Sequence, residues 1–302
     1  MTRLPQIALL PDGKRLHLQD GPIDLVIEAK GAETDIRAAY HAAAERFTGL
    51  LDGLCAELGE LRSAADPRRC ALKGVVARRM HAAVAPFAAD GFITPMAAVA
   101  GSVAEEILGA MLQAAQLDRA YVNNGGDIAL HLADGERFAI GLMDRPDRHG
   151  VMRTMTVDAD SPVRGIATSG RHGRSFSLGI ADAVTVLGHT AAQADAAATV
   201  IANAVDLPGH PAIRRLPANE LQPDSDLGAR FVTRDVGELS EAEIERALEA
   251  GAARAQDLLM SGLIEGAALR LLGETRLVGA TGSDAPESHA FQGQTIDNML
   301  RA

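Results

Sequence analysis

Short strand-like segments joined by tight glycine turns alternate along this chain with long helical segments, and this alternation limits the fold more than any other feature. Strands are expected over 5–30, around the PDGK and QDGP turns, and over 120–168, around NNGGD and ADGE. Two more strands, around LIEGAALRLL and TRLVGA, close the fold. Helical periodicity occurs over 33–61, 73–87, from 91, over 190–205 and after Ser240. Hairpins beside separate helices predict an α+β fold.

The order of these segments predicts one compact unit over 1–282 with two lobes, followed by a polar tail over 283–302. Each lobe should be a mixed or antiparallel sheet packed against helices. A cleft between the lobes is expected where the small-residue helix from 91, the NNGGD turn and the helix starting at Thr190 meet. Residues 207–237 are rich in Pro and Asp, so we expect a long excursion outside the core.

Alanine and glycine must carry much of the packing, because aromatic residues make up only 3% of the chain and Trp is absent. The net charge of −11 argues against a general nucleic-acid binder, which needs a broad basic surface. Cys55 and Cys70 have neither a disulfide nor a metal-site spacing, so we expect two small core residues in a reducing cytoplasm. No apolar run approaches the ~18 residues of a membrane span, and Pro5 and Pro11 interrupt the N-terminus, which is not a signal peptide. The sequence therefore predicts a cytoplasmic protein that contacts neither membrane nor nucleic acid.

The helix starting at Thr190 carries the first candidate site. Thr190 and Gln193 have the spacing of a capping box, which defines the helix start. Asp195 and Thr199 lie four residues apart, so their side chains share one face of this helix. A carboxylate and a hydroxyl are hard oxygen donors, which suit Mg²⁺ or Ca²⁺ better than zinc. The alternative is a solvated Asp195 beside a Thr199 that bonds its own helix backbone.

The NNGGDI stretch, residues 123–128, is the second candidate site. Asn124 and Gly125 form a type I′ hairpin signal, and a plain turn would explain them. In the functional interpretation, Gly125 and Gly126 let a ligand lie against bare backbone. Asp127 would then face that ligand at the start of a strand.

The loop TSGRHGRS, residues 168–175, is the third candidate site and is unusually cationic for an acidic chain. Its arginines, hydroxyls and backbone N–H groups could hold a phosphate or pyrophosphate, since Arg supplies forked donors. The residues concerned are Thr168, Ser169, Gly170, Arg171, His172, Arg174 and Ser175. A solvated surface loop is the alternative. A Ser169–His172–Asp182 triad can also be written, but no spacing rule supports it.

P-loop, Rossmann, zincin and α/β-hydrolase motifs are absent from the sequence. The order of the stretches that are present, however, resembles the ApbE superfamily of FAD:protein FMN transferases, once linked to thiamine biosynthesis. The shared order is a small-residue segment leading into a helix, a Gly-Gly-Asp hairpin, a strand ending GLMDRP, a TSG loop, a V-T-V strand and an A-D-A-x-x-T helix, and it spans 93–205. The chain is most similar to a cytoplasmic branch of that superfamily.

This resemblance implies a two-lobed ApbE-like fold in which FAD lies between the lobes with Mg²⁺ at its pyrophosphate. The implied metal oxygens are those of Asp195, Thr199 and the main-chain carbonyl of Ala97. The flavin nucleotide would be lined by the Gly-Gly-Asp hairpin and the TSG loop. The cationic loop would then be an anion-binding arm that closes over the phosphates next to the metal. The nucleotide-binding set is Asn124, Gly125, Gly126, Asp127, Thr168, Ser169, Gly170, Arg171, His172 and Arg174.

The chain departs from the family pattern at three places. Ala100 stands where family members usually carry a lysine, and Glu105 stands where they carry an aspartate. RHGRSFSLGIADA replaces an H-x-x-D-P-x-T-G segment, so the family histidine has no clear counterpart. Three functions therefore stay open: a Mg²⁺-dependent enzyme that transfers FMN or cleaves the FAD pyrophosphate, a protein that binds a flavin or nucleotide without turnover, and a site that serves an unrelated small molecule. Association into a homo-oligomer also stays open.

Overall fold

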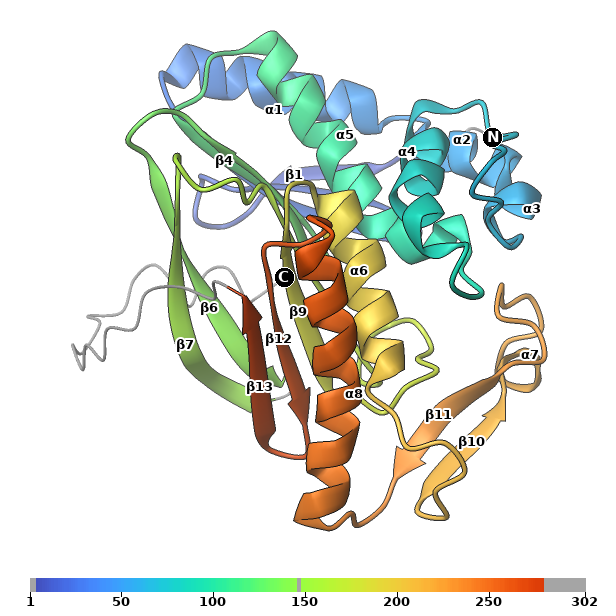
Figure 1. The fold of residues 1–302 in the computed structure, drawn as a ribbon. Helices are drawn as coiled ribbons and strands as arrows, with labels where there is room; N and C mark the ends of the chain where they lie inside the picture. The colour runs from blue at the N-terminus through green and yellow to red at the C-terminus, as the bar shows by residue number, and fades with distance from the viewer. Residues whose placement is uncertain (1–3, 146–147, 280–302) are drawn as a thin grey trace.

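A nine-stranded sheet forms the centre of the molecule, and its neighbouring strands all pair antiparallel (Figure 1). The structure is a computed structural model that describes residues 4–145 and 148–279. In spatial order the strands are β1 (Gln6–Leu9), β2 (Leu16–Asp20), β3 (Ile23–Lys30), β4 (Arg119–Asn124), β5 (Asp127–Leu132), β8 (Gly165–Ser169), β9 (Ala183–Gly188), β12 (Gly266–Leu271) and β13 (Glu274–Gly279). Two separate hairpins are β6 (Arg137–Arg145) with β7 (Arg148–Asp158), and β10 (Ile213–Pro217) with β11 (Phe231–Val236).

Helices cover one face of the sheet, which confirms the predicted α+β class (Figure 1). The α-helices are α1 (Glu33–Phe47), α2 (Leu50–Ala56), α3 (Leu58–Leu61), α4 (Val75–Val84), α5 (Val99–Ala114), α6 (Ala191–Ala204), α7 (Ala218–Leu221) and α8 (Glu241–Met260). Two 3₁₀ helices, η1 (Ala85–Phe87) and η2 (Pro95–Ala98), precede α5. The β6–β7 hairpin covers the opposite face, where Phe138 and Val157 pack with Val26, Tyr121 and Leu130.

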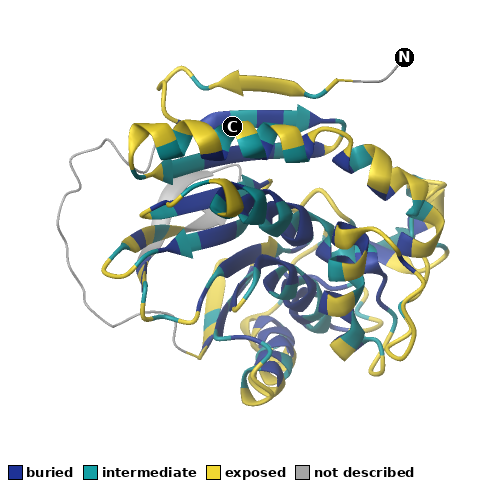
Figure 2. Cartoon of the chain, turned by 90° about the horizontal axis from the view of Figure 1, so that it is seen from above, coloured by how far each residue is buried: buried dark blue, intermediate teal, exposed yellow. Residues whose placement is uncertain are grey.

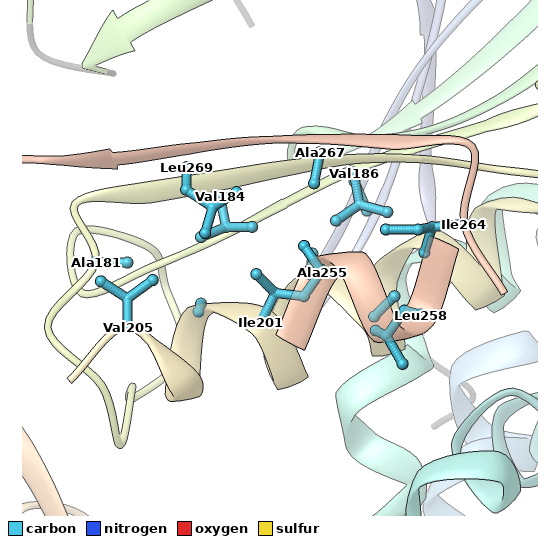
Figure 3. Packing of buried hydrophobic residues seen from close by; sticks show 14 of the residues in the cluster. Ala181, Val184, Val186, Ile201, Val205, Ala255, Leu258, Ile264, Ala267 and Leu269 are labelled. Atoms are coloured by element: carbon cyan, nitrogen blue, oxygen red, sulfur yellow. The ribbon is translucent and has the colours of Figure 1, made fainter. Parts of the chain in front are cut away.

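The sheet has two halves that meet at a short seam. The first half comprises β1 to β5, and its strands β2 to β5 pack against α1, α4 and α5 through one apolar cluster. The edge strand β1 is exposed (Figure 2). The second half, β8, β9, β12 and β13, packs against α6 and α8 through another cluster (Figure 3). Between β5 and β8 only two residue pairs form the ladder, Ile128 with Ile166 and Ala129 with Gly165. The sequence predicted a sheet for each lobe, whereas the structure extends a single sheet through both halves.

The helix predicted over 33–61 is divided into α1, α2 and α3. The first break lies at Gly49, whose φ of +79° is left-handed and cannot continue a right-handed helix. Glycine adopts this conformation without the steric cost that a side chain would add. Apolar residues keep their three- and four-residue spacing across the break, so their pattern gave no sign of it.

Residues 207–237, which we call the strap, form β10, α7 and β11 rather than an irregular excursion (Figure 1). Ile213 and Val232 of the strap are buried, so part of this segment belongs to the core, contrary to the sequence prediction. Short strands with Pro and Asp between them carry too few residues to show a clear period. Hydrophobic periodicity therefore did not predict β10 and β11, whose structure depends on tertiary contacts.

Two further expectations need correction. Cys55 and Cys70 are exposed rather than buried in the core. For Cys55 the reason is that α2 turns Leu50 and Leu54 toward the interior instead. The continuous helical segment Pro95–Ala114 has a mean hydropathy of 1.3, so by length and composition it could cross a membrane. In the structure half of that segment is buried within the fold, and α5 packs against α1 and α6.

Candidate functional site

Helix α6 begins as the sequence predicts, and its first turns lie directly against those of α5. The Gln193 N–H donates to Thr190 Oγ1 (3.2 Å), which gives the helix its N-cap. Gly101 in α5 makes the close approach possible, because a Cβ added there would lie 2.2 Å from the Ala191 carbonyl oxygen. The backbones of the two helices are therefore in contact where both helices begin.

The two helices cap each other at this contact. The Gly101 N–H in α5 donates to Asp195 Oδ2 of α6 (3.0 Å). In return, the Ala192 N–H in α6 donates to Glu105 Oε1 of α5 (2.7 Å). Negative charge near a helix N-terminus is favourable, since the first N–H groups have no partner within the helix. Asp195 therefore has a structural role whether or not it also binds a ligand.

The Asn-Gly-Gly-Asp turn forms the tight hairpin that the sequence predicts. Asn124 pairs with Asp127, so Gly125 and Gly126 make up the whole loop between β4 and β5. Their φ values of +65° and +112° are those for which glycine is favoured. Asn124 is buried, and its Nδ2 donates to the Ala100 carbonyl (3.1 Å), which ties the turn to the start of α5.

Asp127 links the turn to the second half of the sheet. Its Oδ1 accepts a hydrogen bond from the Thr168 N–H in β8 (3.0 Å), across the seam. Its half-buried carboxyl also lies close enough to that of Asp195 for the two charges to interact. Three of the predicted stretches, around Asn124, Thr168 and Asp195, thus come together at one place. We call this place the Asp127–Asp195 site.

The two carboxyls raise the cost of charging each other. Burial raises the pKa of Asp127 to about 7, although the Thr168 N–H opposes the shift. Burial and the negative charge of Asp127 hold the pKa of Asp195 well above its ordinary value, against the N–H groups of Gly101 and Ala100. Among the residues that the structure describes, no cationic side chain forms an ion pair with either carboxyl. A bound cation would supply the missing positive charge.

The donor set suits a small hard cation that also takes ligand oxygens. Within 4–145 and 148–279, no three His, Cys, Asp or Glu side chains gather as a metal cluster. Thr199 is half-buried one turn beyond Asp195, and Ala97 lies in η2, which packs against α6. Mg²⁺ commonly binds through one or two carboxylates plus phosphate oxygens and water, so two carboxylates with a hydroxyl and a carbonyl fit it.

The cationic loop divides into an anchored part and an exposed part. Arg171 is largely buried and pairs with Asp182 through Nε (2.8 Å) and Nη2 (2.6 Å). His172 Nε2 lies 3.2 Å from the same carboxylate oxygen. The Leu272 N–H, in the turn after β12, donates to Asp182 Oδ2 (2.6 Å). Arg171 is therefore an anchor of the loop, where the sequence suggested an exposed arm.

Arg174 is the arginine of this loop that reaches the Asp127–Asp195 site. It is exposed, and its guanidinium carbon lies 3.5 Å from where a Cβ on Gly125 would stand. The guanidinium group thus lies over the bare backbone of the hairpin turn. At the root of the loop, a Cβ on Gly170 would lie 2.5 Å from the Asp182 carbonyl oxygen, which explains the glycine of the TSG stretch. Ser169 is half-buried beside it.

Sequence reasoning missed two polar residues near this site. Thr185 in β9 faces Thr168 across the strand pair, and their hydroxyl oxygens are 2.9 Å apart. The V-T-V pattern was the only signal for Thr185, and it indicated a strand and nothing more. Glu105 was identified only as a departure from a family pattern. Its hydrogen bond from the Ala192 N–H was not predictable, because the two residues are 87 positions apart in the sequence. Of the triad written for Ser169, His172 and Asp182, the structure shows the contact between His172 and Asp182. Arg171 pairs with the same carboxylate oxygen.

Two surface cavities lie away from this site. One of about 610 Å³ is lined by Val236, Leu239, Ile244 and Leu272 among others, and one of about 340 Å³ lies around Glu136 and Asp158. Both are open to solvent and neither includes a residue predicted to bind a ligand. The cleft expected between the lobes stays a prediction.

Known proteins similar to this chain were found by sequence and by structure. A family model described as AbpE bacteria matches residues 7–277. A UPF0280 protein of Methanopyrus kandleri is 36% identical over 128 residues, which cover 42% of this chain and 48% of that protein. A UPF0280 protein of Methanococcoides burtonii is 38% identical over 127 residues, covering 39% and 48%. The chain thus spans about half the length of these relatives. Among solved structures, the flavin transferase ApbE from Vibrio cholerae has a TM-score of 0.42 and 11% identity, covering 92% of this chain and 98% of that one.

Proposed function

The chain belongs to the family described as AbpE bacteria, and we propose that it binds FAD or a related flavin or adenine dinucleotide together with Mg²⁺ at the Asp127–Asp195 site. One observation carries this proposal. Two half-buried carboxyls with raised pKa values lie close enough for their charges to interact, and no cationic side chain among the described residues forms an ion pair with them. The resemblance of the surrounding motifs to the ApbE superfamily supports the choice of a flavin nucleotide.

Mg²⁺ would be held by the carboxylates of Asp195 and Asp127, the hydroxyl of Thr199 and the carbonyl of Ala97. Each carboxylate has several lone-pair sites, so the bonds to Gly101 and Thr168 leave acceptor capacity for a cation. When bound, such an ion neutralises pyrophosphate charge and polarises the phosphoryl group.

The chain's own groups would orient the nucleotide. Gly125 and Gly126 present backbone without side chains, so a phosphate can approach their N–H groups. Arg174 lies over the same turn and would supply forked donors to the phosphates. Asp182 would hold this loop in place through Arg171 and His172. The hydroxyls of Thr168 and Thr185 would offer hydrogen bonds to the polar chain of the flavin.

Two outcomes of nucleotide binding are compatible with the site. In the first, the protein transfers FMN or cleaves the FAD pyrophosphate. In the second, it holds the flavin without turnover, and the α5 segment favours this candidate. Ala100 offers no side-chain cation, and Glu105 is occupied by the Ala192 N–H (2.7 Å) and by Arg79 (3.2 Å). Ala100 therefore cannot replace the family lysine, and the Glu105 carboxylate, which stands at the position of the family aspartate, is already bonded within the protein.

The proposal is tested by calorimetric titration of FAD with and without Mg²⁺, comparing the wild type with Asp195→Asn. The asparagine keeps an oxygen for the Gly101 N–H, so the contact between α5 and α6 should survive while the charge is lost. We expect the Mg²⁺-dependent part of the affinity to fall at least about tenfold, the scale of one charge-assisted bond. Asp257→Asn, on the exposed side of α8, is the matched control. Equal Mg²⁺ dependence in all three proteins would refute the metal site.

Product analysis then separates the two outcomes. Purified protein is mixed with FAD and Mg²⁺, and the mixture is examined for AMP by chromatography. AMP release that is lost in Asp195→Asn indicates an enzyme. Unchanged FAD that remains bound indicates a binding protein.

A further inference from the structure

The strap contacts the segment that leads into η2. The Thr94 hydroxyl donates to Asp226 Oδ2 of the strap (2.5 Å), although 132 positions separate the two residues. The Arg230 guanidinium lies 3.2 Å from the centre of the Phe92 ring. One anionic and one cationic side chain of the strap thus contact two of the three residues before Pro95.

The strap also contacts the segment that follows the cationic loop. The Thr233 N–H in β11 donates to the Ser177 carbonyl (2.9 Å). Arg215 in β10 donates to the Leu178 carbonyl and pairs with Asp206. The strap therefore contacts both the segment before η2 and the segment that follows the cationic loop.

Thr94 is connected by one backbone hydrogen bond to Ala97, whose carbonyl is a proposed metal ligand. Thr94 is buried and is the N-cap residue of η2. Its carbonyl accepts a hydrogen bond from the Ala97 N–H (3.1 Å). η2 packs against α6, the helix that carries Asp195. The position of Thr94 therefore determines where the backbone of Ala97 lies beside α6.

We propose that Asp226 is a positioning residue of the metal site, an inference that rests on the proposed function. Asp226 holds the Thr94 hydroxyl, Thr94 holds the turn of η2, and that turn carries the Ala97 carbonyl. A charged acceptor binds a buried hydroxyl more strongly than a neutral one does, which suits a contact that must fix a backbone segment. Groups that orient a metal ligand commonly change metal affinity by about 10–100-fold when removed.

The strap itself offers a matched control. Asp224 lies two residues before Asp226 and pairs with Arg62 (3.0 Å), the residue that follows α3. This ion pair also ties the strap to the first half, but it makes no contact with the Thr94 side chain. Asp224→Ala therefore removes another carboxylate of the strap, and one of its contacts with the rest of the fold, while the η2 segment stays held.

The experiment measures the Mg²⁺ affinity at saturating FAD and, without ligand, the hydrogen exchange of amides 95–101. Asp226→Ala should weaken Mg²⁺ binding about tenfold to a hundredfold and speed exchange in that segment. Asp226→Asn keeps an oxygen acceptor, so it should return most of the affinity. Asp224→Ala should resemble the wild type in both measurements. Thr94→Val removes the same bond from the other side and replaces Asp226→Ala if that variant does not fold.

Two results would overturn the inference. In the first, Asp226→Ala or Thr94→Val binds Mg²⁺ and exchanges like the wild type. In the second, Asp224→Ala is as impaired as they are, so that the strap only stabilises the fold. If the wild type itself binds no FAD with Mg²⁺, the proposed function fails instead. Exchange of amides 95–101 then decides the positioning role alone, since faster exchange in Asp226→Ala but not in Asp224→Ala supports it.

Discussion

The two halves of the sheet are filled in different ways. The first half uses large side chains, and Leu25, Phe47, Met80 and Ile107 are fully enclosed there. In the second half, helix α6 buries mostly alanine. Its buried residues are Ala191, Ala192, Ala194, Ala196, Ala197, Ala198, Ile201 and Ala202. In Figure 3 this helix lies under β9 and β12, and the labelled side chains between them are those of Val184, Val186, Ile201, Ala267 and Leu269.

Glycines surround α6 on several sides and explain this difference. A Cβ added to Gly101, Gly165 or Gly179 would lie within 2.1 to 2.2 Å of backbone atoms at or just before the helix. Where the first half brings side chains together, the second half thus brings backbones together. Backbone N–H and carbonyl groups then come within reach of polar side chains such as Asp195.

The largest expected effect breaks that backbone contact. Gly101→Ala places a methyl group against the Ala191 carbonyl, which cannot move without shifting α6. Overpacking of this kind should lower the free energy of unfolding by about 3 kcal/mol. Gly109→Ala on the same helix is the control, because nothing lies within 4 Å of its added Cβ. Alanine favours helices, so the control should gain up to about 1 kcal/mol. Urea unfolding of both variants measures the difference, and equal stabilities would contradict this account of the packing.

Sequence patterns predicted the elements that local chemistry determines. The Gly125–Gly126 hairpin and the N-cap at Thr190 were both predicted and are both observed. The break at Gly49 was missed because the apolar spacing continues through it. The strap was missed because its strands are short and gain their burial from residues distant in the sequence.

The candidate site was predicted in its parts but not in its connections. Asp127, Asp195 and Arg174 were singled out from their own surroundings, and the structure brings their segments together. The pairing of Arg171 with Asp182 joins the two ends of a loop whose path no local rule determines. Mutual capping of α5 and α6 depends on how two distant helices cross. Such contacts belong to tertiary structure, so propensity and spacing do not contain them.

A second prediction contrasts the two arginines of the cationic loop. Arg171→Ala leaves the buried Asp182 carboxylate with fewer partners, so it should cost about 2 kcal/mol of stability. Arg174→Ala should change stability by less than about 0.5 kcal/mol, because its side chain is exposed. Nucleotide affinity should respond more directly to Arg174→Ala, falling about tenfold if this arginine contacts phosphate. Thermal unfolding and calorimetry with ADP measure the two effects. A stable Arg171→Ala beside an unstable Arg174→Ala would reverse the assignment of anchor and contact.

The smallest expected effect concerns pH and tests the seam where the halves meet. The folded pKa of Asp127 is about 7 against an ordinary value of 3.8, and that of Asp195 is also raised. The folded state therefore holds protons that the unfolded chain has released, so stability should fall as pH rises from about 4 to about 7. The slope is at most about 1.4 kcal/mol per pH unit for each carboxyl, and solvent contact reduces it.

Asp127→Asn should flatten this decline, because the asparagine does not ionise and the charge opposing Asp195 is gone. If Mg²⁺ binds these oxygens as we propose, it competes with the proton for them, so it should raise the melting temperature at pH 8 and much less at pH 5. Thermal unfolding of both proteins across this range, with and without Mg²⁺, provides the measurement. A parallel pH dependence in wild type and Asp127→Asn would mean that the two carboxyls do not interact across the seam. The cation would then have no charge to neutralise there, and the difference between the halves would be one of packing alone.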